Sequence, residues 1–134
     1  MDYKIEFEVR DNEIDLQGVV NNANYFIYLQ HTRHKYLAEV LNIDYIEMTK
    51  QNMHLFLISS NIEFKKSLLP KDKFYVTCKL VPKGKIRFIF EQEIRLISNN
   101  VLIAKAENIG VCIDGSKNKP FVPNEMKNIL NHNI

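Results

Sequence analysis

Near the start of the chain, residues 13–25 (EIDLQGVVNNANY) place a carboxylate, a glycine and three asparagines close together. Asp15 precedes Gly18 by three residues, and an aspartate there either forms a turn by local hydrogen bonding or serves as a general base or nucleophile toward a carbonyl carbon. The asparagines open a segment with helical spacing. The first amides of a helix have no intrahelical partner and lie at the positive end of its dipole, so they can stabilise an oxyanion.

The elements around this stretch follow from hydrophobic periodicity. Residues 3–9 alternate as in a half-buried strand. A helix is predicted from Asn24 to about Leu41, with Asn21, Asn22 and Asn24 each suited to capping it. Its buried stripe is predicted to contain Tyr25, Tyr28, Leu29, Thr32, Tyr36, Val40 and Leu41. Four further strands are predicted at 54–66, 73–82, 85–97 and 101–114, with a short helix after Pro123.

One long helix and five strands with short connections predict an α+β domain with a mainly antiparallel sheet packed on that helix. The segment 42–53 is polar and is predicted to connect the helix to the second strand. A single helix is too small to cover a five-stranded sheet of this length. We therefore expect a second subunit to cover part of the sheet or its edge, in a homodimer or homotetramer.

Composition narrows the class of protein. A length of 134 residues fits one domain, taken as residues 1–134, and a formal charge of +2 gives no indication of nucleic-acid binding. No apolar run resembles a signal peptide or a membrane span, which predicts a cytoplasmic protein. Cys78 and Cys112 fall in predicted strands without metal-ligand spacing, so we expect reduced core residues.

Asp15-Leu16-Gln17-Gly18-Val19-Val20, followed by Asn24-Tyr25, resembles the D-x-x-G-[VI]-[VI] signature of hotdog-fold acyl-CoA thioesterases of the 4-hydroxybenzoyl-CoA thioesterase type. Matches continue at Arg33 and Tyr36-Leu37 on the helix, and through most of the remaining chain. The resemblance implies a hotdog fold, in which an antiparallel sheet wraps a long helix. It also implies hydrolysis of acyl-CoA to a free acid and CoA without a metal or other cofactor, because CoA is part of the substrate.

The resemblance assigns roles to individual residues. Asp15 matches the family's general base or nucleophile, and the main-chain amide of Asn22 matches its oxyanion donor. Gly18 is expected to allow a tight turn and close approach of the substrate. Many family members have a histidine at the position of Asn22, and asparagine cannot exchange a proton near neutral pH. The residues predicted to bind substrate are Tyr25, Lys83, Lys85 and Arg87, the last three through the phosphates of CoA.

Other functions are compatible with the same residues. A thioesterase acting on acyl carrier protein shares the pantetheine thioester but needs a basic surface for an acidic partner. A binding module could hold acyl-CoA without turnover, and a hotdog dehydratase is disfavoured because no histidine lies between Asp15 and Tyr25. Tyr25 also has the spacing of a core residue. His31 and His34 lie three apart on the helix, but no further residue completes a metal-ligand set.

Overall fold

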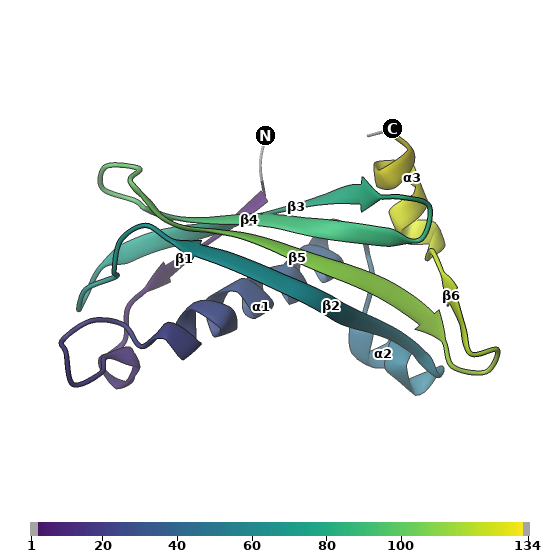
Figure 1. The fold of residues 1–134 in the computed structure, drawn as a ribbon, viewed down its shortest axis with the longest axis horizontal. Coiled ribbons are helices and arrows are strands. Elements are labelled where there is room, and N and C mark those ends of the chain that lie inside the picture. The colour runs from purple at the N-terminus through teal and green to yellow at the C-terminus, as the bar shows by residue number, and fades with distance from the viewer. Residues whose placement is uncertain (1–2, 133–134) are drawn as a thin grey trace.

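The structure is a computed structural model that describes residues 3–132 and contains one six-stranded sheet and three α-helices (Figure 1). The strands are β1 (Tyr3–Glu8), β2 (Met53–Phe64), β3 (Lys73–Lys83), β4 (Arg87–Leu96), β5 (Leu102–Asp114) and β6 (Lys119–Phe121). The helices are α1 (Asn22–Glu39), α2 (Tyr45–Lys50) and α3 (Asn124–His132), and a 3-10 turn, η1, spans Asp11–Glu13.

The sheet has the order β1-β3-β4-β5-β2, every pairing in it is antiparallel, and β6 adds to the end of β5. It curls around α1, which lies along its inner face, while α3 packs at the end where β3 and β4 are joined (Figure 1). The predicted α+β architecture, with one long helix held by an antiparallel sheet, is therefore confirmed.

The prediction missed two short elements and misplaced the start of α1. Helix α2 lies within the segment predicted as a connection, where the Asp44 carboxylate accepts hydrogen bonds from the amides of Ile46 and Glu47. Strand β6 has three residues, too few to show alternation. Helix α1 begins at Asn22 rather than Asn24, because Asn21 caps it by accepting a hydrogen bond from the Ala23 amide.

The predicted inner stripe of α1 is correct except near its end. Tyr25, Tyr28, Leu29, Thr32, Tyr36 and Leu41 are buried as predicted. Val40 is instead 41% exposed, and Leu37 is buried at 2% exposure. Leu37 lies within α1, eight residues after Leu29 on the same face, and Val40 lies just beyond the last helical residue, Glu39.

The two long edges of the sheet differ in chemistry. On β1, the outward positions carry Lys4, Glu6 and Glu8, which discourage pairing with another strand. On β2, several exposed positions are apolar: Phe56 is 50% exposed, Ile58 48% and Phe64 47%. Strand β2 spans twelve residues and pairs only with β5 among the described residues. Strand β2 is therefore the edge that is better suited to pairing with a further strand.

Two other sequence expectations concern the cysteines and the membrane. Both Cys78 and Cys112 are free and buried, and burial raises the pKa of each thiol to about 12. Within residues 3–132, no helix combines the length and the apolar character needed to cross a bilayer.

Candidate active site

The loop between β1 and α1 folds back on itself and presents Asp15. The main-chain amide of Asp15 donates to the carbonyl of Val19 at 2.9 Å, and the amide of Gly18 donates to the carbonyl of Asp15 at 3.1 Å. Gly18 has φ +79°, a conformation that favours glycine, although a Cβ there would meet no atom within 4 Å. The tight turn is therefore the structural reason for Gly18. One oxygen of the half-buried Asp15 carboxylate, Oδ1, accepts from the amide of Gln17 at 2.8 Å.

The start of α1 lies beside this loop. The amide of Asn21 donates to the carbonyl of Glu13 at 2.9 Å, and Ile14 forms a β-bridge with Val20, so the two sides of the loop meet just before the helix. The next amide, that of Asn22, donates no hydrogen bond among the described residues. It occupies the first helical position, where no intrahelical acceptor exists. The loop thus carries a carboxylate seven residues before an unpaired amide at the positive end of the helix.

Glu13, which the sequence prediction missed, connects the loop to the helix. Its Oε1 accepts from the Arg10 amide at 2.8 Å and from the Tyr28 hydroxyl at 2.7 Å. Its carbonyl accepts from the Asn24 side-chain amide at 3.2 Å as well as from Asn21. Burial and the neighbouring Glu13 raise the pKa of Tyr28, which therefore remains a donor. No short motif signals this role, because Tyr28 lies fifteen residues beyond Glu13.

Tyr25 was predicted to bind substrate, but within a single chain it is a buried residue that contacts the segment after β2. It is 2% exposed, and its hydroxyl accepts a hydrogen bond from the Leu68 amide at 2.9 Å. Its ring lies edge-on to Phe64, with centroids 5.2 Å apart. Burial raises its pKa, so the phenol stays neutral. Tyr25 therefore fixes the segment after β2 against α1, and we assign it no substrate contact.

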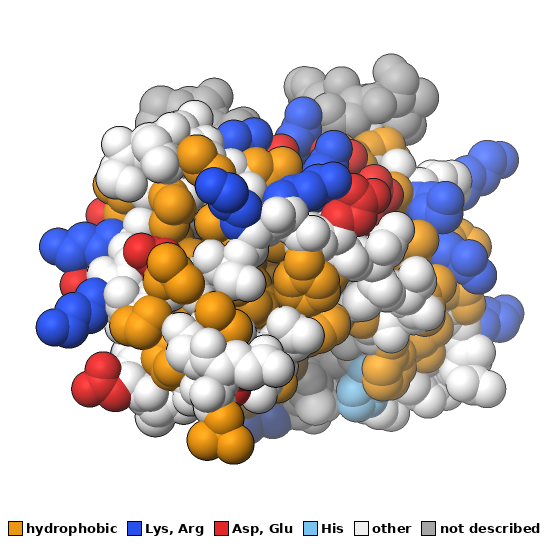
Figure 2. All heavy atoms as spheres, turned by 60° about the vertical axis from the view of Figure 1, so that its left-hand side comes forward, with side chains coloured by type: hydrophobic (Ala, Val, Ile, Leu, Met, Phe, Trp, Pro, Cys, Tyr) orange, Lys and Arg blue, Asp and Glu red, His pale blue; other side chains and the backbone are white. Residues whose placement is uncertain are grey.

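The surface at this end of the molecule is apolar in the middle. Figure 2 shows hydrophobic side chains gathered at the centre of this face, with Lys and Arg side chains toward its margin. The exposed apolar residues of the Asp15 loop, the second turn of α1, the end of β2 and the following segment are Leu16, Phe26, Ile27, Phe64 and Leu69. Such a surface suits an acyl chain or a protein partner.

The predicted phosphate-binding cations lie far from Asp15 within one chain. Lys83, Lys85 and Arg87 belong to the β3–β4 turn, whereas the Asp15 loop packs near the opposite end of β3, which begins at Lys73. Ten strand steps of about 3.3 Å separate Lys73 from Lys83, about 33 Å in total.

Two of the three predicted cations line a cavity near the β3–β4 turn. Lys85 and Arg87 line a cavity of about 380 Å³ together with Lys127, which α3 contributes. Lys127 was not predicted, because only the packing of α3 brings it to the turn.

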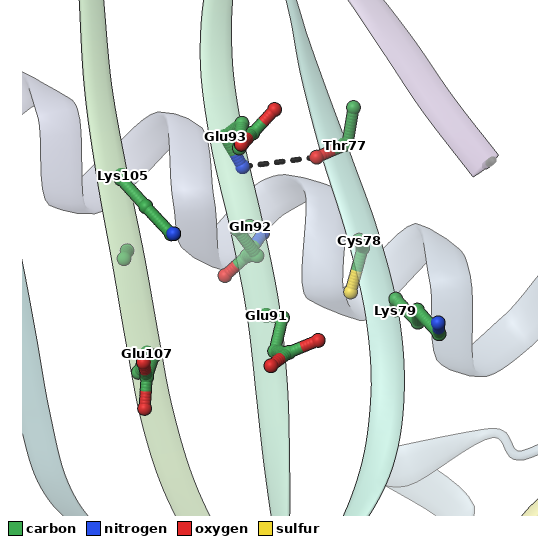
Figure 3. A pocket seen from close by; sticks show the side chains of 9 residues that line it. Thr77, Cys78, Lys79, Glu91, Gln92, Glu93, Lys105 and Glu107 are labelled. Carbon is green, nitrogen blue, oxygen red and sulfur yellow. Dashed lines mark hydrogen bonds between the residues drawn. The ribbon is translucent and has the colours of Figure 1, made fainter. Parts of the chain in front are cut away.

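A second hollow, of about 260 Å³, lies on the outer face of the sheet (Figure 3). Its rim carries charges of both signs, including Glu91, Glu93 and Lys105, and α1 lies behind the sheet in this view. The Glu93 amide is already bonded to the Thr77 hydroxyl at 2.9 Å. The β3–β4 register is interrupted at this hollow, between the pairs Val76–Ile94 and Lys79–Glu91, and none of its lining residues belongs to a helix.

Comparison with known proteins agrees with this fold. The sequence pattern of the thioesterase-like superfamily matches residues 9–130. An acyl-acyl carrier protein thioesterase of Arabidopsis thaliana is 31% identical over 130 residues, which are 97% of this chain and 68% of that protein. A putative esterase of Aquifex aeolicus is 27% identical over 118 residues, covering 88% of this chain and 89% of that protein.

Solved structures show the same architecture. DHNA-CoA thioesterase from Staphylococcus aureus is 25% identical, with a TM-score of 0.78 over 90% of this chain and 79% of that chain. A 1,4-dihydroxy-2-naphthoyl-CoA thioesterase from Synechocystis has a TM-score of 0.87 over 97% and 96% of the two chains, but its 19% identity supports only the fold. The chain therefore belongs to the thioesterase-like superfamily and is a thioester hydrolase with the hotdog fold.

Proposed function

We propose that the protein hydrolyses acyl-CoA to a carboxylic acid and CoA at the start of α1. The observation that carries this proposal is the hydrogen-bonded loop that presents Asp15 and leads directly into α1, where the Asn22 amide is unpaired among the described residues. Asp15 either removes a proton from the attacking water or attacks the thioester carbon itself. The Asn22 N–H stabilises the oxyanion that forms in either case. The chemistry requires no cofactor.

The asparagine at position 22, where many relatives have histidine, is compatible with this reaction. A thiol has an ordinary pKa of about 8.5, so CoA can leave as a thiolate without first receiving a proton from an imidazole. The role given to Asn22 uses its main-chain N–H, and its exposed side chain is not required. The mechanism therefore rests on one carboxylate and one amide.

The carrier of the acyl group can be CoA or acyl carrier protein. The Arabidopsis relative is named for acyl carrier protein and the Staphylococcus enzyme for a CoA thioester, and both carriers present a pantetheine thioester. We favour CoA, because the cavity lined by Lys85, Arg87 and Lys127 offers cations for its phosphates.

Kinetics with one acyl group on both carriers test this assignment. We expect hexanoyl-CoA to have a kcat/KM about tenfold above that of the hexanoyl carrier protein, since tenfold corresponds to about 1.4 kcal/mol, or one charge-assisted hydrogen bond. Lys85→Gln should raise the KM for hexanoyl-CoA while kcat is retained. A preference for the carrier protein would instead make the acyl-carrier-protein thioesterase the better description.

A second copy of the chain would complete the site. Antiparallel pairing of two β2 strands about a two-fold axis covers the exposed β2 edge and sets the Phe64 end of one copy beside the Met53 end of the other. The catalytic loop of one copy would then lie near the β3–β4 turn of its partner. This arrangement would bring together an Asp15 loop and a set of cations that a single chain places near opposite ends of β3.

The predicted dimer can be disrupted at β2. Ile58 is 48% exposed and lies at the irregularity between Leu57 and Ser59, so Ile58→Lys should leave the monomer fold intact. Two lysines near the two-fold axis would repel each other, and we expect dimer dissociation to become at least about tenfold easier. Sedimentation velocity over a concentration series measures this. Lys4→Gln, on the β1 edge, is the matched control, and an unchanged dimer in Ile58→Lys would contradict pairing through β2.

Glu13 is expected to position the catalytic loop. Replacing Glu13 by alanine removes the acceptor for Arg10 and Tyr28, and a shift of the loop by about 1 Å is enough to lower kcat by up to about a hundredfold. Glu13→Gln keeps an acceptor oxygen and should retain most of the activity. The measurement is kcat and KM for all three forms, with thermal unfolding as the check on folding. A kcat for Glu13→Ala equal to that of the wild type would exclude this role.

A further inference from the structure

A cavity of about 340 Å³ lies between the second half of α1, the start of α2 and the first half of β2. Arg33 lines it, together with His34, Tyr45, Leu37, Leu55 and Leu57. Arg33 follows Asn22 by eleven residues on the same helix, about 16 Å along the axis. This cavity is therefore separate from the catalytic loop of its own chain.

Arg33 is a partly buried cation that forms no ion pair among the described residues. Its Nη1 donates to the Oε1 of Gln92 at 3.1 Å. Gln92 is 1% exposed and is itself fixed, since it donates to the carbonyl of Leu29 at 3.1 Å and accepts from Asn108 at 3.2 Å. The guanidinium is thus held in one orientation by a neutral acceptor.

Within residues 3–132, no carboxylate forms an ion pair with this guanidinium. Burial lowers the pKa of Arg33, and the nearby Cys78 thiol, with a pKa raised to about 12, is uncharged near neutral pH. Burial also lowers the pKa of His34, and the positive charges of Arg33 and His31 lower it further. A charge in this setting is normally paired.

The remaining donors of Arg33 are free to bind a ligand. Neither Nε nor Nη2 has a hydrogen-bond partner among the described residues, whereas every fully buried side-chain nitrogen and oxygen of those residues has one. Nε and Nη2 are therefore not fully buried, and Arg33 is one of the residues that line the cavity. Together they form the parallel pair of N–H groups that binds both oxygens of a carboxylate.

The side chains that line the cavity indicate which kind of carboxylate ligand would fit it. The His34 ring stacks on that of Tyr45, with centroids 4.4 Å apart and an interplanar angle of 25°. Leu37, Leu55 and Leu57 supply apolar surface. A free phosphate would leave these walls without contacts, whereas a small aromatic or aliphatic carboxylate uses both the fork and the walls.

We propose that this cavity is a binding site for small free carboxylic acids, with Nε and Nη2 of Arg33 holding the carboxylate. This proposal includes among its ligands the acids that the proposed hydrolysis releases, and it concerns a cavity that the proposed β2 pairing would set toward the Phe64 end of the partner's β2 strand. Its failure would leave the assignment of Asp15 untouched, because the test below measures binding rather than turnover.

Isothermal titration of the full-length protein with benzoate and hexanoate tests the proposal, with benzyl alcohol and inorganic phosphate as comparison ligands. We expect saturable binding of the carboxylates, at least about tenfold weaker in Arg33→Lys, which keeps the charge but loses the planar fork. Benzyl alcohol and phosphate should bind much more weakly than benzoate. Lys85→Gln, which removes a cation from the β3–β4 turn, is the matched control and should leave the benzoate affinity unchanged.

Several outcomes would overturn the site. These are absence of saturable benzoate binding, equal affinity in Arg33→Lys, or phosphate binding as tight as that of benzoate. Sedimentation velocity of Arg33→Lys gives a further outcome that would overturn the site. A changed oligomeric state with unchanged benzoate affinity would mean that the guanidinium pairs with a carboxylate of a second copy of the chain. If Arg33→Lys does not fold, Tyr45→Ala decides instead, because loss of this partly exposed wall must weaken benzoate binding.

Discussion

Replacing Asp15 by asparagine is expected to lower thiol release from acyl-CoA by at least about a hundredfold and to leave acyl-CoA binding nearly unchanged. Asparagine has nearly the same shape, and its side-chain oxygen can still accept the hydrogen bond from the Gln17 amide that Asp15 accepts now. The loop therefore keeps its conformation, whereas the amide can neither remove a proton from water nor attack the thioester. Steady-state kinetics and a titration with a non-hydrolysable acyl-CoA analogue measure the two quantities separately.

Asp11→Asn is the matched control for Asp15→Asn, because Asp11 is an exposed carboxylate in the preceding turn. It should retain the wild-type kcat. The two buried thiols, Cys78 and Cys112, have pKa values of about 12 and should add little to a thiol assay on the folded protein. If Asp15→Asn and Asp11→Asn have the same activity, Asp15 has no chemical role.

Replacing Asn22 by proline is the second large effect we predict, with kcat lowered by about 10²–10³-fold. Proline lacks the main-chain N–H, and it is well tolerated at the first position of a helix. The preceding residue, Asn21, has φ −62° and ψ 138°, which is the extended conformation that proline requires before it. The substitution therefore removes the proposed oxyanion donor without breaking α1.

Asn22→Ala separates the amide from the side chain, since it keeps the N–H and removes the carboxamide. It should retain most of the wild-type kcat, and circular dichroism should show equal helix content in both variants. An Asn22→Pro enzyme that is folded and as active as Asn22→Ala would exclude this amide as the oxyanion donor. Equal losses in the two variants would instead give the role to the side chain.

The sequence predicted the long strands well, because alternation over ten or more residues leaves little choice of face. Over the predicted strand 85–97, alternation assigns Ile86, Phe88, Phe90, Ile94 and Leu96 to one face. The last four face inward, whereas Ile86 lies before β4 and is 43% exposed. Gln92 takes the inward position between Phe90 and Ile94. The sequence did not predict its burial, because glutamine is polar and its hydrogen-bond partners come from α1 and β5. The short elements α2 and β6 offered too few residues for a period to show.

The candidate site was predictable to the extent that it is local in sequence. Asp15, Gly18 and Asn22 lie within eight consecutive residues, and the structure places them on one loop and the adjoining helix turn. Glu13 and Lys127 were missed, since their roles depend on contacts made across the fold. For the same reason the sequence could not show that Lys83, Lys85 and Arg87 lie at the far end of the sheet.

The most direct test of the central claim is thiol release by the wild-type protein from a panel of short, long and aromatic acyl-CoAs, with Asp15→Asn measured beside it. The mechanism predicts turnover on at least one member of the panel, and near-complete loss of that turnover in Asp15→Asn. Tight binding of acyl-CoA without thiol release on any member would contradict hydrolysis of acyl-CoA at the Asp15 loop.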